Sequence, residues 1–197
     1  MRDWHGLHVL VNKSNPLPAD FVPKDLVIPE VSFSFSEDHP RKYLRREAAV
    51  ALERLFAYAQ TMGIYLVAAS GYRSYETQAA IFANHVERLG TLGANRESAR
   101  PGESEHQTGL AMDITSKLVG FKLVEEFGST PEGRWLATHA SQFGFILRYP
   151  VGKEKVTGYI YEPWHYRYLG ENLAHQVTES GLTYEEFLLQ EVNTQDD

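Results

Sequence analysis

Residues 104–115 read Ser-Glu-His-Gln-Thr-Gly-Leu-Ala-Met-Asp-Ile-Thr, and the alternation in their second half predicts a β-strand over residues 110–115. Successive side chains of a strand point to opposite faces. The core face would carry Leu110, Met112 and Ile114, and the other face Gly109, Ala111 and Asp113. Two small residues beside one carboxylate leave room for a bulky group next to Asp113, such as a metal with its substrate. A surface loop leading into an ordinary edge strand explains the same pattern equally well.

A second stretch with reactive side chains is Tyr-Glu-Pro-Trp-His-Tyr-Arg-Tyr at residues 161–168. As a strand, it would place His165 and Arg167 on one face and the aromatic side chains on the other. Glu162 lies three residues before His165, next to a proline that would end regular pairing. Strands of this composition are also common in protein cores and at interfaces. Alone, this stretch is therefore only modest support for a functional site.

Together the two stretches supply three ligands for a catalytic zinc ion, namely His106, Asp113 and His165. Catalytic zinc sites use three such protein ligands and leave a fourth position to water. Glu162 is then a spare carboxylate that can act as the catalytic base and take a proton from that water. A chain of 197 residues can bury a full core without a metal. We therefore expect one Zn²⁺ per chain, with a catalytic role.

Composition excludes several other classes of protein. The formal net charge of −7 argues against a nucleic-acid partner. The chain has no cysteine, which excludes thiol nucleophiles, zinc ribbons and the zinc deaminases that His85-Val86-Glu87 would otherwise suggest. No apolar run is long enough for a transmembrane helix. The N-terminal sequence does not look like a secretory signal, so either the protein is cytoplasmic or a leader has been removed.

Helical and extended patterns follow one another irregularly along the chain, which favours an α+β fold. Residues 1–38 are rich in proline and should form an extended N-terminal arm packed on the domain of residues 39–197, with a short strand at 7–11. Helices are predicted over residues 40–62, 74–90 and 131–144, and strands over 64–69, 110–115, 145–149 and 159–168. Residues 91–104 should form a polar loop. Thr183 and Glu186 are spaced as a capping box before a last short helix.

Three motifs resemble the D-alanyl-D-alanine carboxypeptidase family of the VanY type, which includes related L,D-carboxypeptidases of peptidoglycan. The pattern SxHxxGxAxD is met at residues 104–113, and the pattern ExWH at residues 162–165. An upstream pattern, YRS…Q, is met by Tyr72, Arg73, Ser74 and Gln78. The stretch LVNKSNPLP near the N-terminus also resembles the start of this family's domain. The resemblance thus spans nearly the whole chain.

This resemblance implies a zinc metallopeptidase that removes the terminal D-alanine from peptidoglycan stem peptides or their precursors. It implies a small domain with an antiparallel sheet at the site, and a bacterial cell-envelope location. If the matching positions have the same roles as in the family, zinc is bound by His106, Asp113 and His165, and Glu162 is the general base. Arg73 would polarise the scissile carbonyl or bind the substrate carboxylate. Gln78 and Ser104 would hold the peptide end, and Tyr161 would line the pocket.

Other functions fit the same motifs. A D,D-dipeptidase or an L-alanyl-D-glutamate endopeptidase would share the fold, and a cell-wall binding module could keep the zinc fold without catalysis. The intact Glu162 argues against a pure binder, because a binder has no need of a base beside an open metal. We expect a monomer.

Overall fold

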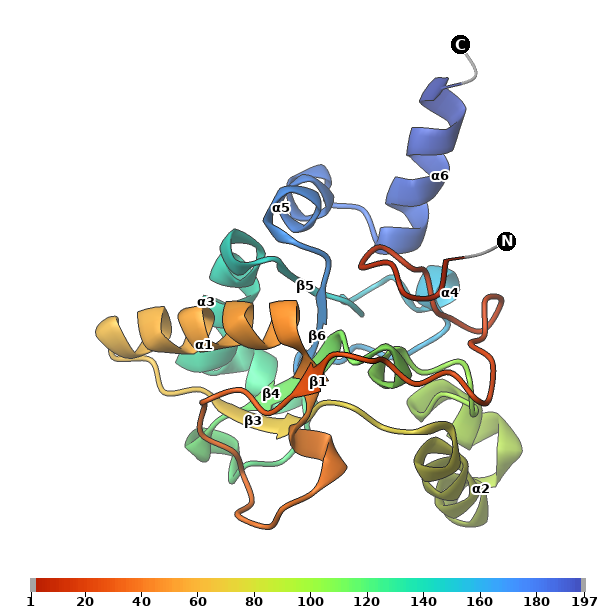
Figure 1. The fold of residues 1–197 in the computed structure, drawn as a ribbon, viewed down its shortest axis with the longest axis horizontal. Coiled ribbons are helices and arrows are strands. Elements are labelled where there is room, and N and C mark those ends of the chain that lie inside the picture. The colour runs from red at the N-terminus through yellow and green to blue at the C-terminus, as the bar shows by residue number, and fades with distance from the viewer. Residues whose placement is uncertain (1–2, 196–197) are drawn as a thin grey trace.

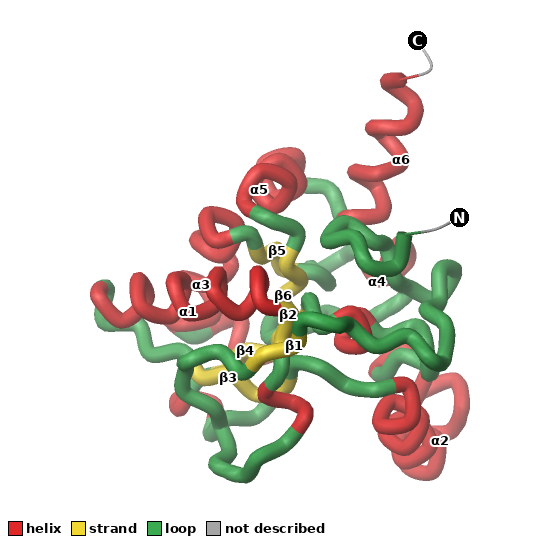
Figure 2. Tube along the Cα trace, viewed as in Figure 1, coloured by secondary structure: helices red, strands yellow, loops and turns green. Residues whose placement is uncertain are grey.

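A four-stranded antiparallel sheet lies at the centre of the molecule (Figure 2). The computed structural model describes residues 3–195. The strands are β3 (Val67–Ser70), β4 (Ala111–Thr115), β5 (Phe145–Leu147) and β6 (His165–Tyr168), in the spatial order β3-β4-β6-β5. The predicted α+β fold with a central antiparallel sheet is thus confirmed.

One face of the sheet packs against two helices, α1 (Arg46–Thr61) and α3 (Pro131–His139) (Figure 1). Leu110, Met112 and Ile114 are fully buried in this core, as their alternation predicts. Leu52 and Leu55 of α1 pack into the same core. Full burial of each such side chain contributes about 1.5–3 kcal/mol. The side chains of Ala111 and Asp113, which alternate with these residues, therefore lie on the other face of β4.

The remaining helices lie around the sheet. Helix α2 (Tyr75–Glu97) lies across the sheet from α1 and α3 (Figure 1). Beyond β5 come the single turn α4 (Glu154–Thr157), then α5 (Glu171–Ser180) and α6 (Tyr184–Gln195), which projects from the body. Short 3₁₀ turns cover Pro40–Lys42, Glu105–Thr108, Lys117–Val119, Glu125–Ser129 and Ala140–Phe143.

The N-terminal segment runs along the domain and has its own small apolar cluster. Val11, Leu17 and Phe21 are buried together. The Leu17 amide donates to the Gly102 carbonyl at 2.8 Å. The strand predicted at residues 7–11 is wrong, because these residues lie in turns and irregular backbone. Residues 1, 2, 196 and 197, the outer ends of the predicted arm and domain, lie outside the described residues.

The helix predicted from residue 40 begins later. Residues 40–42 form a 3₁₀ turn, and β2 (Leu44–Arg45) pairs with β1 (Leu26–Val27) before α1 starts. The helical spacing of Leu44 with later residues concealed a strand whose partner lies in the N-terminal segment. Gly63, at φ 73°, follows the end of α1 as predicted.

Other boundaries differ from the sequence prediction as well. Strand β3 covers Val67–Ser70 rather than 64–69, and β5 ends at Leu147 rather than at residue 149. Helix α3 ends at His139, and a 3₁₀ turn replaces the rest of the helix predicted to residue 144.

Helix α2 continues past Gly90 to Glu97 through a kink at this glycine, whose φ is 70°, so the predicted loop shrinks to residues 98–104. The strand predicted over residues 159–168 covers only 165–168, because residues 159–164 form irregular backbone with a turn at 163–164. The capping box is present, with the Glu186 amide donating to Thr183 Oγ1 at 3.2 Å and the Thr183 amide to Glu186 Oε2 at 2.8 Å.

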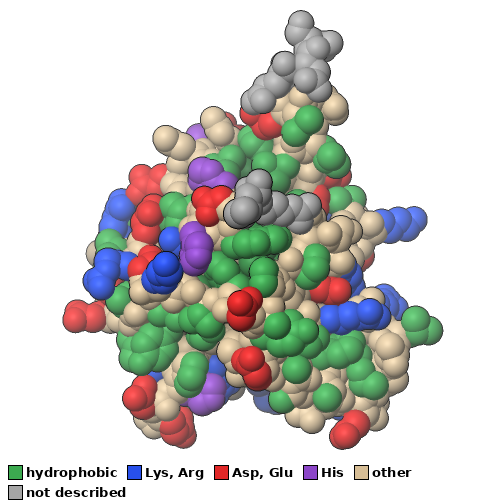
Figure 3. All heavy atoms as spheres, turned by 45° about the vertical axis from the view of Figure 1, so that its right-hand side comes forward, with side chains coloured by type: hydrophobic (Ala, Val, Ile, Leu, Met, Phe, Trp, Pro, Cys, Tyr) green, Lys and Arg blue, Asp and Glu red, His purple; other side chains and the backbone are tan. Residues whose placement is uncertain are grey.

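The surface is mixed in charge. Acidic and basic side chains are interspersed over the face drawn in Figure 3, among apolar ones. Within residues 3–195, none of the helices combines the length and apolar character needed to span a bilayer.

Candidate metal centre

The pairing of β4 with β6 brings Asp113 and His165 together. The two residues are direct partners in the antiparallel register, so their side chains leave the same face of the sheet. Asp113 Oδ1 lies 3.2 Å from His165 Nδ1. The neighbouring pair, Met112 and Tyr166, points into the core. A slip of one residue would turn these two side chains out of the core, so core packing fixes the register of the site.

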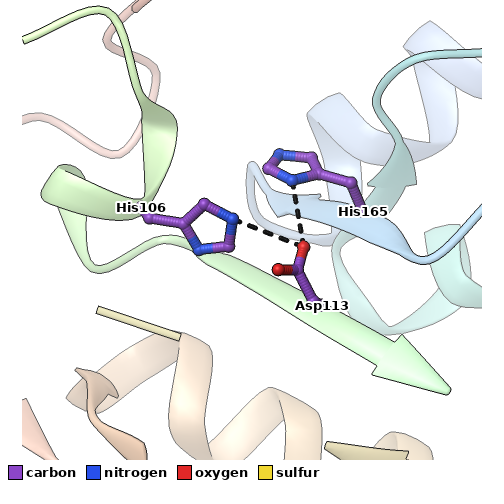
Figure 4. Close-up of side chains that lie close together, drawn as sticks. All are labelled: His106, Asp113 and His165. Atoms are coloured by element: carbon purple, nitrogen blue, oxygen red, sulfur yellow. Dashed lines mark hydrogen bonds and ion pairs between the residues drawn. The ribbon is translucent and has the colours of Figure 1, made fainter. Parts of the chain in front are cut away.

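His106 approaches from the 3₁₀ turn just before β4 (Figure 4). The turn ends at Gly109, whose φ of 67° glycine adopts without steric cost. His106 Nε2 lies 3.3 Å from the same Asp113 Oδ1. On its other side, His106 Nδ1 lies 2.7 Å from the Gly71 carbonyl oxygen. Nδ1–H donates to this carbonyl, which leaves the Nε2 lone pair facing Asp113.

The three side chains fit one tetrahedral metal ion. One ligand atom from each lies within 4.8 Å of the others, and all three residues are buried. Two atoms bound at about 2.1 Å to a tetrahedral zinc ion are about 3.4 Å apart. The separations of 3.2 and 3.3 Å from Asp113 Oδ1 to the two ring nitrogens match that geometry. Two imidazoles and one carboxylate are also a donor set used by catalytic zinc.

The electrostatics of the cluster favour a bound cation. Burial alone would raise the pKa of Asp113, but His106, Arg73 and the histidine hydrogen bonds outweigh it and hold this pKa well below its usual range. Burial, reinforced by Arg73, lowers the pKa of His106 to about 4, so its ring is neutral and able to bind a metal. For His165, burial is outweighed by hydrogen bonds with Asp113 and Glu105, which raise its pKa to about 9. This position therefore attracts positive charge, as a proton or as a metal.

Glu162 lies at the edge of this cluster. Its Oε2 is 3.9 Å from His165 Nδ1, and only 8% of the residue is exposed. The chain turns back on itself here, with the His165 amide donating to the Glu162 carbonyl at 3.1 Å. Burial raises the pKa of Glu162 to about 7, with His165 opposing the shift and Asp113 adding to it. Such a carboxylate can exchange a proton near neutral pH.

Arg73 holds the other oxygen of Asp113. Its Nη2 donates to Asp113 Oδ2 at 2.5 Å and its Nε to Ser70 Oγ at 2.9 Å. The Arg73 amide also donates to the His106 carbonyl at 3.3 Å. The guanidinium is thus fixed beside the cluster, with 17% of the side chain still exposed.

A cavity of about 480 Å³ opens over the cluster. Its lining includes the three clustered residues together with Glu162, Arg73, Gln78 and Ser104. Gln78 is buried rather than solvated. Its Nε2 donates to the Ala99 carbonyl at 2.7 Å, and its buried Oε1 has no hydrogen-bond partner among residues 3–195. Tyr161 is not part of this lining, since its hydroxyl packs over Gly128. The role expected for Tyr161 therefore gains no support from its position.

Several residues around the site were not predicted from the sequence to belong to it. Glu105 Oε2 lies 3.2 Å from His165 Nε2, although Glu105 adjoins the other histidine in the chain. Arg148 and Arg167 both bind Glu105. The alternation of His165 with Arg167 placed both residues on one face of the strand, but the partner of Arg167 is visible only in the fold. Gly71 was missed as well; a Cβ there would lie 2.4 Å from the Tyr43 carbonyl oxygen.

The chain is similar to known proteins over most of its length. Residues 41–171 match the family model VanY, described as D-alanyl-D-alanine carboxypeptidase. YodJ of Bacillus subtilis is 52% identical over 90% of this chain, and the D-alanyl-D-alanine carboxypeptidase of Enterococcus faecalis is 35% identical over 91%. The matched region spans 65% of the length of each of these two relatives.

Solved structures show the same fold. The LdcB LD-carboxypeptidase superposes with a TM-score of 0.91 at 49% identity, covering 95% of this chain and 88% of LdcB. A vancomycin-resistance D,D-pentapeptidase VanY, solved with Zn(II), superposes with a TM-score of 0.76 at 34% identity, covering 94% of this chain and 99% of VanY. With a family model matching well over half of its length, this chain belongs to the VanY family of D-alanyl-D-alanine carboxypeptidases.

Proposed function

We propose that the protein is a zinc-dependent carboxypeptidase that removes the C-terminal D-alanine from peptidoglycan stem peptides. The observation that carries this proposal is the buried cluster of His106, Asp113 and His165, with the spare carboxylate of Glu162 beside it in one cavity. The zinc in the related VanY structure supports the choice of metal. One ion per chain and action by a monomer at the bacterial cell envelope belong to the same proposal.

A bound zinc ion would polarise the scissile carbonyl and make a nearby water more acidic. Glu162 accepts the proton of that water and later returns it to the amine of the leaving D-alanine, so the carboxylate is regenerated in each turnover. The products are the shortened peptide and free D-alanine. The pKa of Glu162, raised by burial to about 7, suits both proton transfers near neutral pH.

Arg73 stabilises negative charge on the substrate. Its guanidinium lies in the cavity wall and is held by Asp113 and Ser70, so it needs no reorganisation when charge develops on the carbonyl oxygen or when the substrate carboxylate binds. Gln78 and Ser104 line the same cavity as His106. These two residues are our candidates for holding the peptide end.

We infer the bond between an L-diamino acid and D-alanine as the preferred cleavage site. The higher identity and TM-score to the LD-carboxypeptidase LdcB than to the D,D-pentapeptidase VanY favour it. A D,D-bond is the second candidate, because the enterococcal relatives are named for it. VanXYC of Enterococcus gallinarum, 35% identical over 90% of this chain, is named as both a dipeptidase and a carboxypeptidase.

Mass analysis of products from defined stem tetrapeptide and pentapeptide tests the proposal. We expect loss of a single alanine, faster from the tetrapeptide, and no product in the presence of a chelator. Faster loss of one alanine from the pentapeptide would assign the D,D-bond instead. Release of a dipeptide, or cleavage between L-alanine and D-glutamate, would contradict the carboxypeptidase assignment. A zinc-loaded protein that hydrolyses none of these peptides would favour the binding module.

A further inference from the structure

Behind the metal centre, Glu105 connects the two sides of the site. It precedes His106 in the chain, yet its side chain reaches His165, with 3.2 Å between Glu105 Oε2 and His165 Nε2. The Glu105 side chain is completely shielded from solvent. His165 Nδ1, on the opposite edge of the ring, faces Asp113. The imidazole is therefore held at both nitrogens, one by each carboxylate.

Two arginines determine which way the Glu105 carboxylate points. Arg148 Nε donates to Glu105 Oε1 at 2.8 Å, and Arg167 Nη1 donates to the same oxygen at 2.9 Å. Both side chains are fully buried. With Oε1 occupied by two charged donors, Oε2 is the oxygen left for His165. An uncompensated buried charge is strongly destabilising, so the carboxylate and the arginines require one another.

The arginines are themselves fixed by distant parts of the chain. Arg167 Nη2 donates to the carbonyls of Leu7 and Val9, at 2.9 and 2.8 Å, in the N-terminal segment. Arg148 makes a two-pronged pair with Glu185 of α6, at 2.8 and 2.5 Å. The first and last parts of the fold thus meet behind β6. Both segments contact an arginine that binds Glu105, and Glu105 in turn contacts the ring of His165.

We propose that Glu105 is a positioning residue for metal binding. It accepts the Nε2–H of His165, which fixes the ring orientation and leaves the Nδ1 lone pair directed at the metal position. Carboxylates that accept the second ring N–H of a metal-binding histidine raise its basicity as a ligand, and their loss costs about 10–100-fold in metal affinity or activity. The ring of His106 is oriented in a similar way, but by the Gly71 carbonyl, which accepts its Nδ1–H. The inference rests on the proposed zinc site.

A purely structural role for the buried ions is the competing explanation. Glu185 provides the matched control, because it binds Arg148 with both oxygens, as Glu105 does with one, but none of its described contacts is to His165. In Glu105→Gln the two arginine donors hold the remaining carbonyl oxygen, so an NH₂ group faces His165 Nε2 in place of an acceptor. Glu185→Gln disturbs the same ion cluster one step further away. A role confined to stability makes the two variants equivalent in metal binding.

Competition with a chromophoric chelator, at neutral pH and with the full chain, measures the zinc affinity of both variants. We expect Glu105→Gln to bind zinc about 10–100-fold more weakly than wild type, and Glu185→Gln to stay within about threefold. Unchanged affinity in Glu105→Gln, or an equal loss in both variants, would overturn the proposal. A wild-type chain that binds no zinc would instead overturn the proposed function on which the inference rests.

If Glu105→Gln does not fold, nitrogen-15 NMR of the zinc-loaded wild type tests the same point. The proposal expects a His165 ring with a slowly exchanging proton on Nε2 and the metal on Nδ1, and a His106 ring with the opposite arrangement. Metal on His165 Nε2 would contradict it, because this nitrogen then has no proton to donate to Glu105.

Discussion

Two buried carboxylates that both lie beside His165 Nδ1, those of Asp113 and Glu162, are given opposite properties by their surroundings. Asp113 has two histidines on one oxygen and Arg73 on the other, which together overcome burial and keep its pKa well below the usual range. Among residues 3–195, the ion-pair partner of Glu162 is His165, at the longer distance of 3.9 Å, so burial dominates and raises the pKa of Glu162 to about 7. The first is suited to bind a metal as a permanent anion, and the second to exchange protons.

The raised pKa of Glu162 predicts an acid limb in the pH profile. A base must be ionised, and protonation as the pH falls through its pKa removes the active form. We expect kcat/KM to decline with unit slope below about pH 7, or lower once a bound cation favours the carboxylate. Steady-state kinetics on the tetrapeptide over a range of pH measures this limb. A profile that stays flat down to about pH 4 would contradict the assignment of Glu162 as base.

At the scale of single elements, α6 matters because it carries Glu185, which binds Arg148. The helix begins with a capping box in which Thr183 and Glu186 each satisfy the other's backbone amide. These bonds replace lost helical partners. The start of α6 is also anchored in the core, because Tyr184 is fully buried in an apolar cluster with Leu169 and Val177. Further along the helix, Leu189 and Val192 are exposed.

Replacing Thr183 with alanine removes one half of this capping box. We expect Thr183→Ala to lower the free energy of unfolding by about 1 kcal/mol while zinc affinity stays unchanged. Urea unfolding followed by circular dichroism measures the first quantity, and chelator competition the second. Ser180→Ala, in the last turn of α5, is a control that leaves the capping box of α6 intact. A loss of several kcal/mol would mean that Thr183 contributes more than its half of the cap.

The sequence predicted the elements well where the signal is local. Alternation predicted the two faces of β4, and glycines marked the ends of α1 and of the turn before β5. It failed where long-range pairing decides the structure. Leu44 fits a helical pattern but pairs with Val27, and the extended run from residue 159 pairs only from His165 onward.

The same distinction holds within the site. His106, Asp113, His165 and Glu162 could be chosen from two short stretches, since the metal chemistry limits the residue types, and the structure brings all four together. The contacts of Glu105 could not be predicted, because its arginine partners come from two other strands or their ends. Tyr161 was expected to line the pocket, whereas its hydroxyl packs over Gly128.

At the scale of the whole molecule, the residues of the site are separate from the main apolar core. The main apolar cluster joins α1, α3 and one face of the sheet, and the metal cluster lies on the other face. The fold should therefore persist without metal, with the metal adding stability through binding to the native state alone.

Metal removal tests whether the fold persists without the ion. We expect chelator-treated protein to keep its far-ultraviolet circular dichroism, while its Tm falls by about 5–11 °C relative to protein with free zinc at about 100 times its Kd. Differential scanning calorimetry measures the shift. His106→Ala should show no zinc-dependent change in Tm. Loss of secondary structure on chelation would show that the metal is structural.

The central claim is that a metal triad and a separate base act together in this cavity. Zinc content and alanine release, measured side by side on wild type and Glu162→Gln, test it most directly. We predict that the variant retains one zinc per chain while its kcat falls by about 10²–10⁴-fold, because only the proton transfer is lost. A variant that holds zinc and releases alanine at the wild-type rate would contradict the account.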